Sequence, residues 1–79
     1  MRKSIDGNII DMDFVSGKTL STVGYDEEAR VLAIEFCRGP VYVYNEVPKS
    51  IYDELLKAPL PDDFFEEKIR YAYKNRRVW

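Results

Sequence analysis

The sequence predicts an α+β domain: a three- to four-stranded antiparallel sheet with two C-terminal helices packed on one face. Two observations predict the sheet. Apolar runs flank Arg38-Gly39-Pro40, as is typical of a β-hairpin, and residues 31–48 combine β-branched and aromatic residues with a turn signal more fully than any other segment. A third observation predicts the helices: after Pro48 the apolar residues recur at helical rather than at strand spacing.

Length and composition limit the class of protein. The 79 residues accommodate one domain, and a hydrophobic content of 46% excludes intrinsic disorder over most of the chain. Cys37 is the one cysteine and there is no histidine, so no internal disulfide, zinc site or cofactor is expected. A lone thiol favours a reducing, cytoplasmic setting. No signal peptide or membrane-spanning stretch is visible, so we expect a soluble protein with no membrane partner.

The charges are unevenly distributed along the chain. A net charge of −2, from 12 basic and 14 acidic side chains, gives no global argument for nucleic-acid binding. Residues 62–67 nevertheless hold four acids, whereas residues 68–77 hold five bases and no acid. The sequence therefore predicts a basic C-terminal patch beside an acidic one.

Residues 1–14 are expected to form an N-terminal strand or arm, and residues 15–79 a single domain. Asp6-Gly7 is a turn dipeptide, and Ile10, Met12 and Phe14 then alternate with aspartates. This pattern predicts a strand with one apolar face, which either extends the sheet at its edge or lies across it.

The sheet is expected to consist of strands at 20–25 and 31–37 and of a second hairpin strand that contains Tyr42 and Tyr44, with a polar turn at 26–29. Cys37-Arg38-Gly39 fits a three-residue loop with Gly39 in the left-handed conformation. Such a loop pairs Ile34 with Tyr42 and Leu32 with Tyr44, whereas a two-residue loop would turn both tyrosines to the opposite face.

The register favours Tyr42 and Tyr44 facing inward, with their rings beneath the helices and their hydroxyl groups at the rim. The alternative is that both rings are exposed on the sheet and form a stacking platform for unpaired bases.

Two helices are expected after the hairpin. Pro48 opens the first at its first turn and Lys57 ends it, with Ile51 and Leu55 on one apolar stripe. The prolines at 59 and 61 stop this helix. Asp62 or Asp63 is expected to cap the second helix, with Asp63 and Glu66 at capping-box spacing. Its apolar face comprises Phe65, Ile69, Ala72 and Tyr73, and its C-terminal half carries the basic residues.

The order of short motifs along the chain resembles the KTSC domain. This family is named for a C-terminal extension of some lysyl-tRNA synthetases and also occurs as small stand-alone bacterial and phage proteins. The matching residues, spread over about 15–73, are Val15-Ser16, Gly24-Tyr25-Asp26, Leu32, Ile34, Phe36, Gly39, Tyr42, Tyr44, Val47-Pro48, Tyr52, Ala58, Phe64-Phe65, Ile69-Arg70 and Tyr73. The resemblance implies the fold, and RNA binding as a suggested family role, without an established activity.

The chain departs from the family pattern in two places. It has Ala58-Pro59-Leu60-Pro61-Asp62 and then Glu66 where the family tends to have Ala-x-Ser-x-Gly and then aromatic-Phe-Asn. Ser16 is also followed by Gly17 rather than by a second serine. The resemblance implies that a family site built on those serines is degraded here.

The main functional hypothesis is a small non-catalytic module that binds nucleic acid, RNA in the first place, or a nucleotide. Basic side chains would contact phosphates and aromatic rings would stack on bases. The residues assigned to these roles are Arg70, Tyr73, Lys74, Arg76, Arg77, Tyr42 and Tyr44. The competing interpretation of the basic residues is a solvated helix end in which Glu66 pairs with Arg70.

The alternative hypothesis is a protein-interaction or self-assembling module. The sheet face opposite the tyrosines carries Val31, Ala33, Val41 and Val43, which is too apolar for open water. Either the N-terminal strand covers this face, or a second copy or a partner protein does. A third hypothesis is a protein that sequesters a small ligand in a pocket at a dimer seam.

Enzymatic activity is not expected. Without histidine there is no His-based triad, and the carboxylates of residues 62–67 are explained by their position at a helix start. Cys37 beside Arg38 has no base to activate its thiol. We therefore assign no catalytic residue and no metal ligand.

Overall fold

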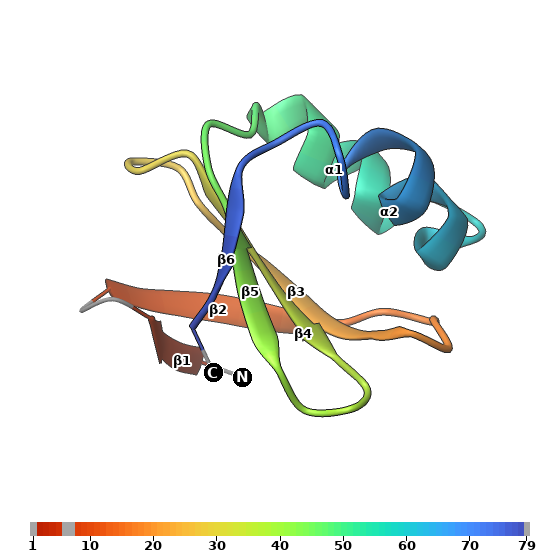
Figure 1. Ribbon diagram of the computed structural model, residues 1–79, viewed down its shortest axis with the longest axis horizontal. Helices are drawn as coiled ribbons and strands as arrows, with labels where there is room; N and C mark the ends of the chain where they lie inside the picture. The colour runs from red at the N-terminus through yellow and green to blue at the C-terminus, as the bar shows by residue number, and fades with distance from the viewer. Residues whose placement is uncertain (1, 6–7, 79) are drawn as a thin grey trace.

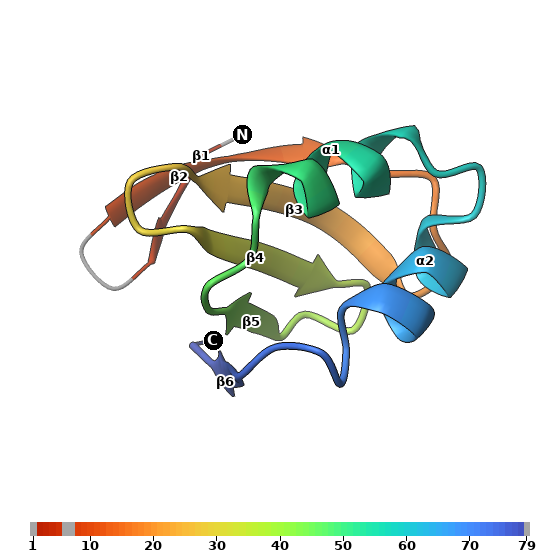
Figure 2. The same ribbon diagram turned by 90° about the horizontal axis from the view of Figure 1, so that it is seen from above.

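The computed structural model describes residues 2–5 and 8–78. It shows a six-stranded antiparallel sheet, in the order β1-β2-β3-β4-β5-β6, and two helices that cover one of its faces (Figures 1 and 2). The elements are β1 Arg2–Ile5, β2 Asn8–Phe14, β3 Leu20–Asp26, β4 Val31–Phe36, β5 Val41–Tyr44, α1 Lys49–Lys57, α2 Pro61–Lys68 and β6 Asn75–Arg77. Neither helix of these described ranges is long and apolar enough to cross a membrane.

The predicted α+β class is confirmed, but the expected number of strands is wrong. The sheet has six strands, not three to four, because a short strand is added at each edge. β1 pairs with β2, and β6 pairs with β5 after the helices. The Asp6-Gly7 turn predicted between the first two strands lies outside the described residues.

The β4–β5 hairpin has the predicted register. Leu32 lies opposite Tyr44, and Ile34 lies opposite Tyr42. The Phe36 N–H donates to the Pro40 carbonyl at 3.0 Å, and the Gly39 N–H donates to the Phe36 carbonyl at 2.9 Å. Gly39 has φ of +113°, a conformation that glycine adopts without steric cost. The loop is therefore the three-residue one.

The C-terminal segment differs from the prediction. α2 ends at Lys68 instead of continuing through the basic residues, and the chain then turns and forms β6. Without β6, β5 would be an edge strand with one row of unpaired backbone groups. Pairing with β6 satisfies those groups of β5, whereas a longer α2 would leave them unpaired. The expectation that Ala72 and Tyr73 continue the helical face of Phe65 is thus wrong.

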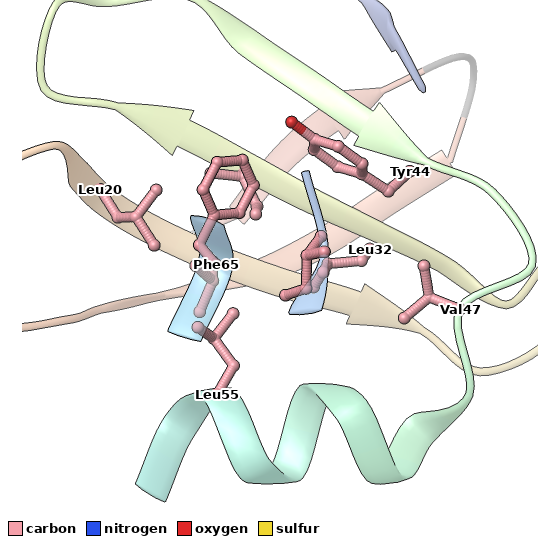
Figure 3. Close-up of a cluster of buried hydrophobic side chains, with 9 residues drawn as sticks. Leu20, Leu32, Tyr44, Val47, Leu55 and Phe65 are labelled. Atoms are coloured by element: carbon pink, nitrogen blue, oxygen red, sulfur yellow. The ribbon is translucent and has the colours of Figure 1, made fainter. Parts of the chain in front are cut away.

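The helix side of the sheet contains the larger hydrophobic core. Side chains from β3, β4 and β5 meet Leu55 of α1 and Phe65 of α2, as Figure 3 shows. Tyr44 is only 3% exposed and belongs to this core, while Tyr42 is half-buried and packs against it. The inward orientation favoured by the register is therefore observed.

The opposite face of the sheet is covered by the N-terminal hairpin. Ile5, Ile10 and Met12 are buried against Ala33, Val41 and Val43, and Figure 1 shows the β1–β2 hairpin on the side of the sheet away from α1 and α2. Gly24 makes this approach possible, because a Cβ atom there would overlap the Asp11 carbonyl oxygen.

The interface assigned to Val31, Ala33, Val41 and Val43 is therefore not an open surface. Val31 is half-buried and the other three are at most 1% exposed, covered by the chain's own strands. Of the three covers considered, the N-terminal strand is the one present, so this face is not open to a second copy or a partner protein. Phe14, expected to share this cover, is 76% exposed instead.

Two neighbouring isoleucines allow a test of this second core. Ile10→Ala should lower the free energy of unfolding by about 2–5 kcal/mol, because it removes a side chain that is 3% exposed. Ile9→Ala makes the same chemical change in the same strand at a side chain that is 70% exposed, and should change it by less than about 0.5 kcal/mol. Urea unfolding of both variants gives the comparison, and equal losses would show that the hairpin does not cover the sheet.

Candidate nucleic-acid interface

A cleft of about 720 Å³ opens where the β4–β5 loop, the β2–β3 loop, the end of α2 and β6 come together. This volume lies within the usual range for small-molecule sites. The residues that line it are Lys18, Thr19, Phe36, Cys37, Arg38, Pro40, Tyr42, Tyr44, Phe65, Glu66, Arg70, Tyr71 and Asn75.

The inner wall of the cleft is a cluster of interlocked aromatic rings. Phe36 packs edge-on against both Tyr42 and Phe65, and Tyr44 packs edge-on against Phe65, each with ring centroids 5.6 Å apart. Edge-to-face packing of this kind holds aromatic side chains in fixed orientations. Burial, followed by the neighbouring Tyr42, raises the pKa of Tyr44 to about 12, so the Tyr44 hydroxyl group stays protonated at neutral pH.

One aromatic ring at the cleft is largely exposed to solvent. Tyr71 is 83% exposed, and the Arg70 guanidinium lies 5.2 Å from its ring centroid. An exposed tyrosine beside a guanidinium offers a flat surface for stacking together with a positive charge.

The charge of the cleft has the opposite sign to that of the chain. The lining contains three cations, Lys18, Arg38 and Arg70, and one carboxylate, that of Glu66. Its net charge is therefore +2, against −2 for the whole molecule. Arg77 adds to this side, since it lies directly opposite Tyr42 on β5 and cross-strand partners share a face.

Glu66 and Arg70 form an ion pair one helical turn apart. The Arg70 Nη1 donates to both carboxylate oxygens of Glu66, at 2.8 Å and 3.0 Å. The hydrogen bond to Glu66, followed by its charge, raises the pKa of Arg70. The pairing expected in the helix-end interpretation is thus present, yet both side chains remain about half exposed and line the cleft.

Asp62 holds one wall of the cleft in place. Its carboxylate accepts backbone N–H groups of the β2–β3 loop from Lys18 at 2.8 Å, Thr19 at 3.1 Å and Leu20 at 3.1 Å. Burial raises the pKa of Asp62, but the three backbone hydrogen bonds outweigh burial and hold that pKa below its usual value of 3.8. The prediction that Asp62 or Asp63 caps α2 is wrong: Leu60 is the N-cap residue, without a side-chain cap, and Pro61 begins the helix.

The cleft brings together only some of the residues assigned to binding. Tyr42, Tyr44 and Arg70 line it, and Arg77 adjoins it on β6. Three others lie outside the lining. Tyr73 packs against the helix-side core, the Lys74 carbonyl accepts the Asn45 N–H at 2.9 Å, and Arg76 lies opposite Val43 on the other face of the sheet.

Sequence reasoning missed Lys18, Arg38 and Asn75 as members of the cleft. Arg38 in the hairpin loop and Tyr71 within the basic segment were visible as motifs, but Lys18 reaches the cleft only through the contact of its loop with Asp62. Cys37 also lines the cleft and is exposed. Within the described ranges no group of three His, Cys, Asp or Glu side chains is placed to hold a metal ion.

Three comparisons with known proteins place this geometry in context. The model of the KTSC domain family matches residues 16–73. The crystal structure of a KTSC domain protein from Yersinia pestis superposes with a TM-score of 0.83 at 27% identity, and covers 89% of this chain and 99% of that one.

Relatives also match in sequence, two of them as follows. A protein of Tsukamurella paurometabola is 38% identical over 47 residues, which is 60% of this chain and 70% of the relative. A lysine–tRNA ligase of Nostoc punctiforme is 33% identical over 62 residues, which is 78% of this chain and 11% of the ligase. This chain therefore corresponds to a small part of that ligase.

The hydrogen bonds of Asp62 predict an acid-dependent loss of stability. Because its folded pKa is lowered, the ionised carboxylate stabilises the fold above the unfolded pKa, and this contribution disappears as the pH falls through the folded value, below 3.8. Asp62→Asn should lower the free energy of unfolding by about 1 kcal/mol at pH 7, with the difference from the wild type shrinking below pH 4.

Denaturant unfolding between pH 3 and pH 7 measures this difference. Asp63→Asn is the matched control, because it removes an exposed carboxylate from the same first turn of α2 and should change the free energy of unfolding by less than about 0.5 kcal/mol. Equal stability of Asp62→Asn and the wild type at pH 7 would show that the three contacts do not hold the loop.

Proposed function

This chain belongs to the KTSC domain family, and we propose that it is a small, non-catalytic module that binds single-stranded nucleic acid, RNA in the first place, in the aromatic cleft. The observation that carries the proposal is the local charge: an acidic chain gathers three cations along a cleft lined by aromatic rings. Cations on a groove and exposed rings are the combination by which proteins hold unpaired strands.

The relative from Nostoc punctiforme supports RNA as the ligand. It is named a lysine–tRNA ligase, and the segment that matches this chain makes up 11% of it. A module of this size attached to a protein that handles tRNA is well placed to add contacts to RNA.

The aromatic lining of the cleft favours a single strand over a duplex. Bases within a duplex are stacked on each other and present only their edges, so aromatic rings inside a cleft can stack only on unpaired bases. Tyr71 is the exposed ring for stacking, while Arg38 and Lys18 are the cations placed for phosphates. The alternative of a partner protein on the apolar sheet face has no support in this fold, because that face is buried.

Replacing Arg38 tests the phosphate contacts. Arg38→Ala should weaken binding of a labelled single-stranded RNA and reduce the slope of log K against log salt by about 0.7, as expected for one lost phosphate contact. Fluorescence anisotropy at several NaCl concentrations measures both quantities. Lys57→Ala is the control, because Lys57 is exposed at the end of α1 and does not line the cleft. Absence of RNA binding by the wild type at low salt would refute the proposed function.

Replacing Tyr71 tests the stacking. Tyr71→Ala should weaken RNA binding about tenfold, within the range found for removing one base–aromatic stack. The melting temperature should not change, since the ring is 83% exposed. Tyr71→Phe keeps the ring and should bind like the wild type, and equally tight binding by Tyr71→Ala would remove Tyr71 from the site.

A further inference from the structure

We propose that the ion pair of Glu66 and Arg70 gives the cleft a preference for guanine among the unpaired bases. This inference rests on the proposed function and adds the base that the site selects. Its starting point is the position of Glu66, which is the one carboxylate among the described residues that line the cleft.

A carboxylate is unfavourable in a site that contacts only phosphates. Two like charges a few ångströms apart repel each other, and the repulsion is stronger beside a protein wall than in bulk water. The three cations of the cleft would hold phosphates better with a neutral residue in place of Glu66. A group that donates hydrogen bonds, in contrast, is attracted to Glu66.

The ion pair leaves hydrogen-bonding positions of both side chains available to such a group. A carboxylate has about four acceptor positions, and Arg70 occupies one on each oxygen. A guanidinium has five N–H donors, of which only those on Nη1 are directed to Glu66. Since both side chains are about half exposed, acceptors and donors lie side by side where a ligand can reach them.

Guanine is the base whose polar atoms match this arrangement. Its N1–H and its N2 amino group are adjacent donors that fit the two oxygens of a carboxylate, and its O6 and N7 accept from an arginine. Adenine and cytosine each offer one amino group, and uracil offers a single imino N–H between two carbonyl oxygens. Only guanine can therefore make a paired contact with the carboxylate.

The neighbouring side chains suit a base in this position. Tyr71 follows Arg70 directly, and its exposed ring lies at the same rim of the cleft. A base held at this rim can present its edge to the ion pair, with the phosphate on the side of Arg38 and Lys18.

The test uses RNA heptamers of uridine in which the central base is guanine, adenine, cytosine or uracil. The wild type should bind the guanine heptamer about tenfold more tightly than the uracil heptamer, as expected for one paired base contact. Glu66→Gln should lose this preference while it still binds the uracil heptamer. Glu67→Gln removes the same charge at the next position, outside the cleft, and should keep the preference.

The outcomes separate the inference from the function on which it rests. Equal binding of all four heptamers by the wild type, or an unchanged guanine preference in Glu66→Gln, would refute the role of Glu66 and leave RNA binding intact. No binding of any heptamer by the wild type would refute the proposed function and the inference together.

Discussion

The register of the β4–β5 hairpin is the constraint on which the rest of the structure depends. The positive φ of Gly39 permits a three-residue loop, and this loop length places Tyr42 and Tyr44 on one face and Val41 and Val43 on the other. A shift by one residue would exchange the two sets. The aromatic wall of the cleft would then face the N-terminal hairpin, and the valines would face the helices. Both hydrophobic cores and the cleft therefore follow from one loop.

The contact between Gly17 and Asp62 connects the two departures from the family pattern. A Cβ atom at position 17 would lie 2.6 Å from the Asp62 carboxylate oxygen, closer than a real side chain tolerates. In the pattern to which this chain is similar, position 17 carries a serine and position 62 a glycine. In this chain Asp62 provides the hydrogen bond that holds the Lys18 backbone in the cleft wall.

The sequence was sufficient for those parts of the fold that local patterns determine. Alternation and the turn residues predicted the hairpin, its loop and its register, because period and turn geometry together allow one pairing. β6 could not be predicted in this way. Residues 75–77 are exposed and polar, so their conformation is set by the open edge of β5 rather than by their own pattern. The sequence pattern consequently assigned most of the basic residues to a helix. In the structure three of the binding candidates, Tyr73, Lys74 and Arg76, lie outside the lining of the cleft.

The cleft itself could be predicted only in part, because it joins segments that are distant in the sequence. Arg70 and the two tyrosines carried visible signals, but Lys18 and Asn75 come from loops and edges that only the folded chain brings together. The overall charge does not describe the cleft, for a physical reason. The molecule extends over 31 × 24 × 19 Å, whereas charges in physiological salt are screened over about 8 Å. Acids on distant elements therefore contribute little at the cleft, and the local excess of cations decides whether a phosphate is attracted there.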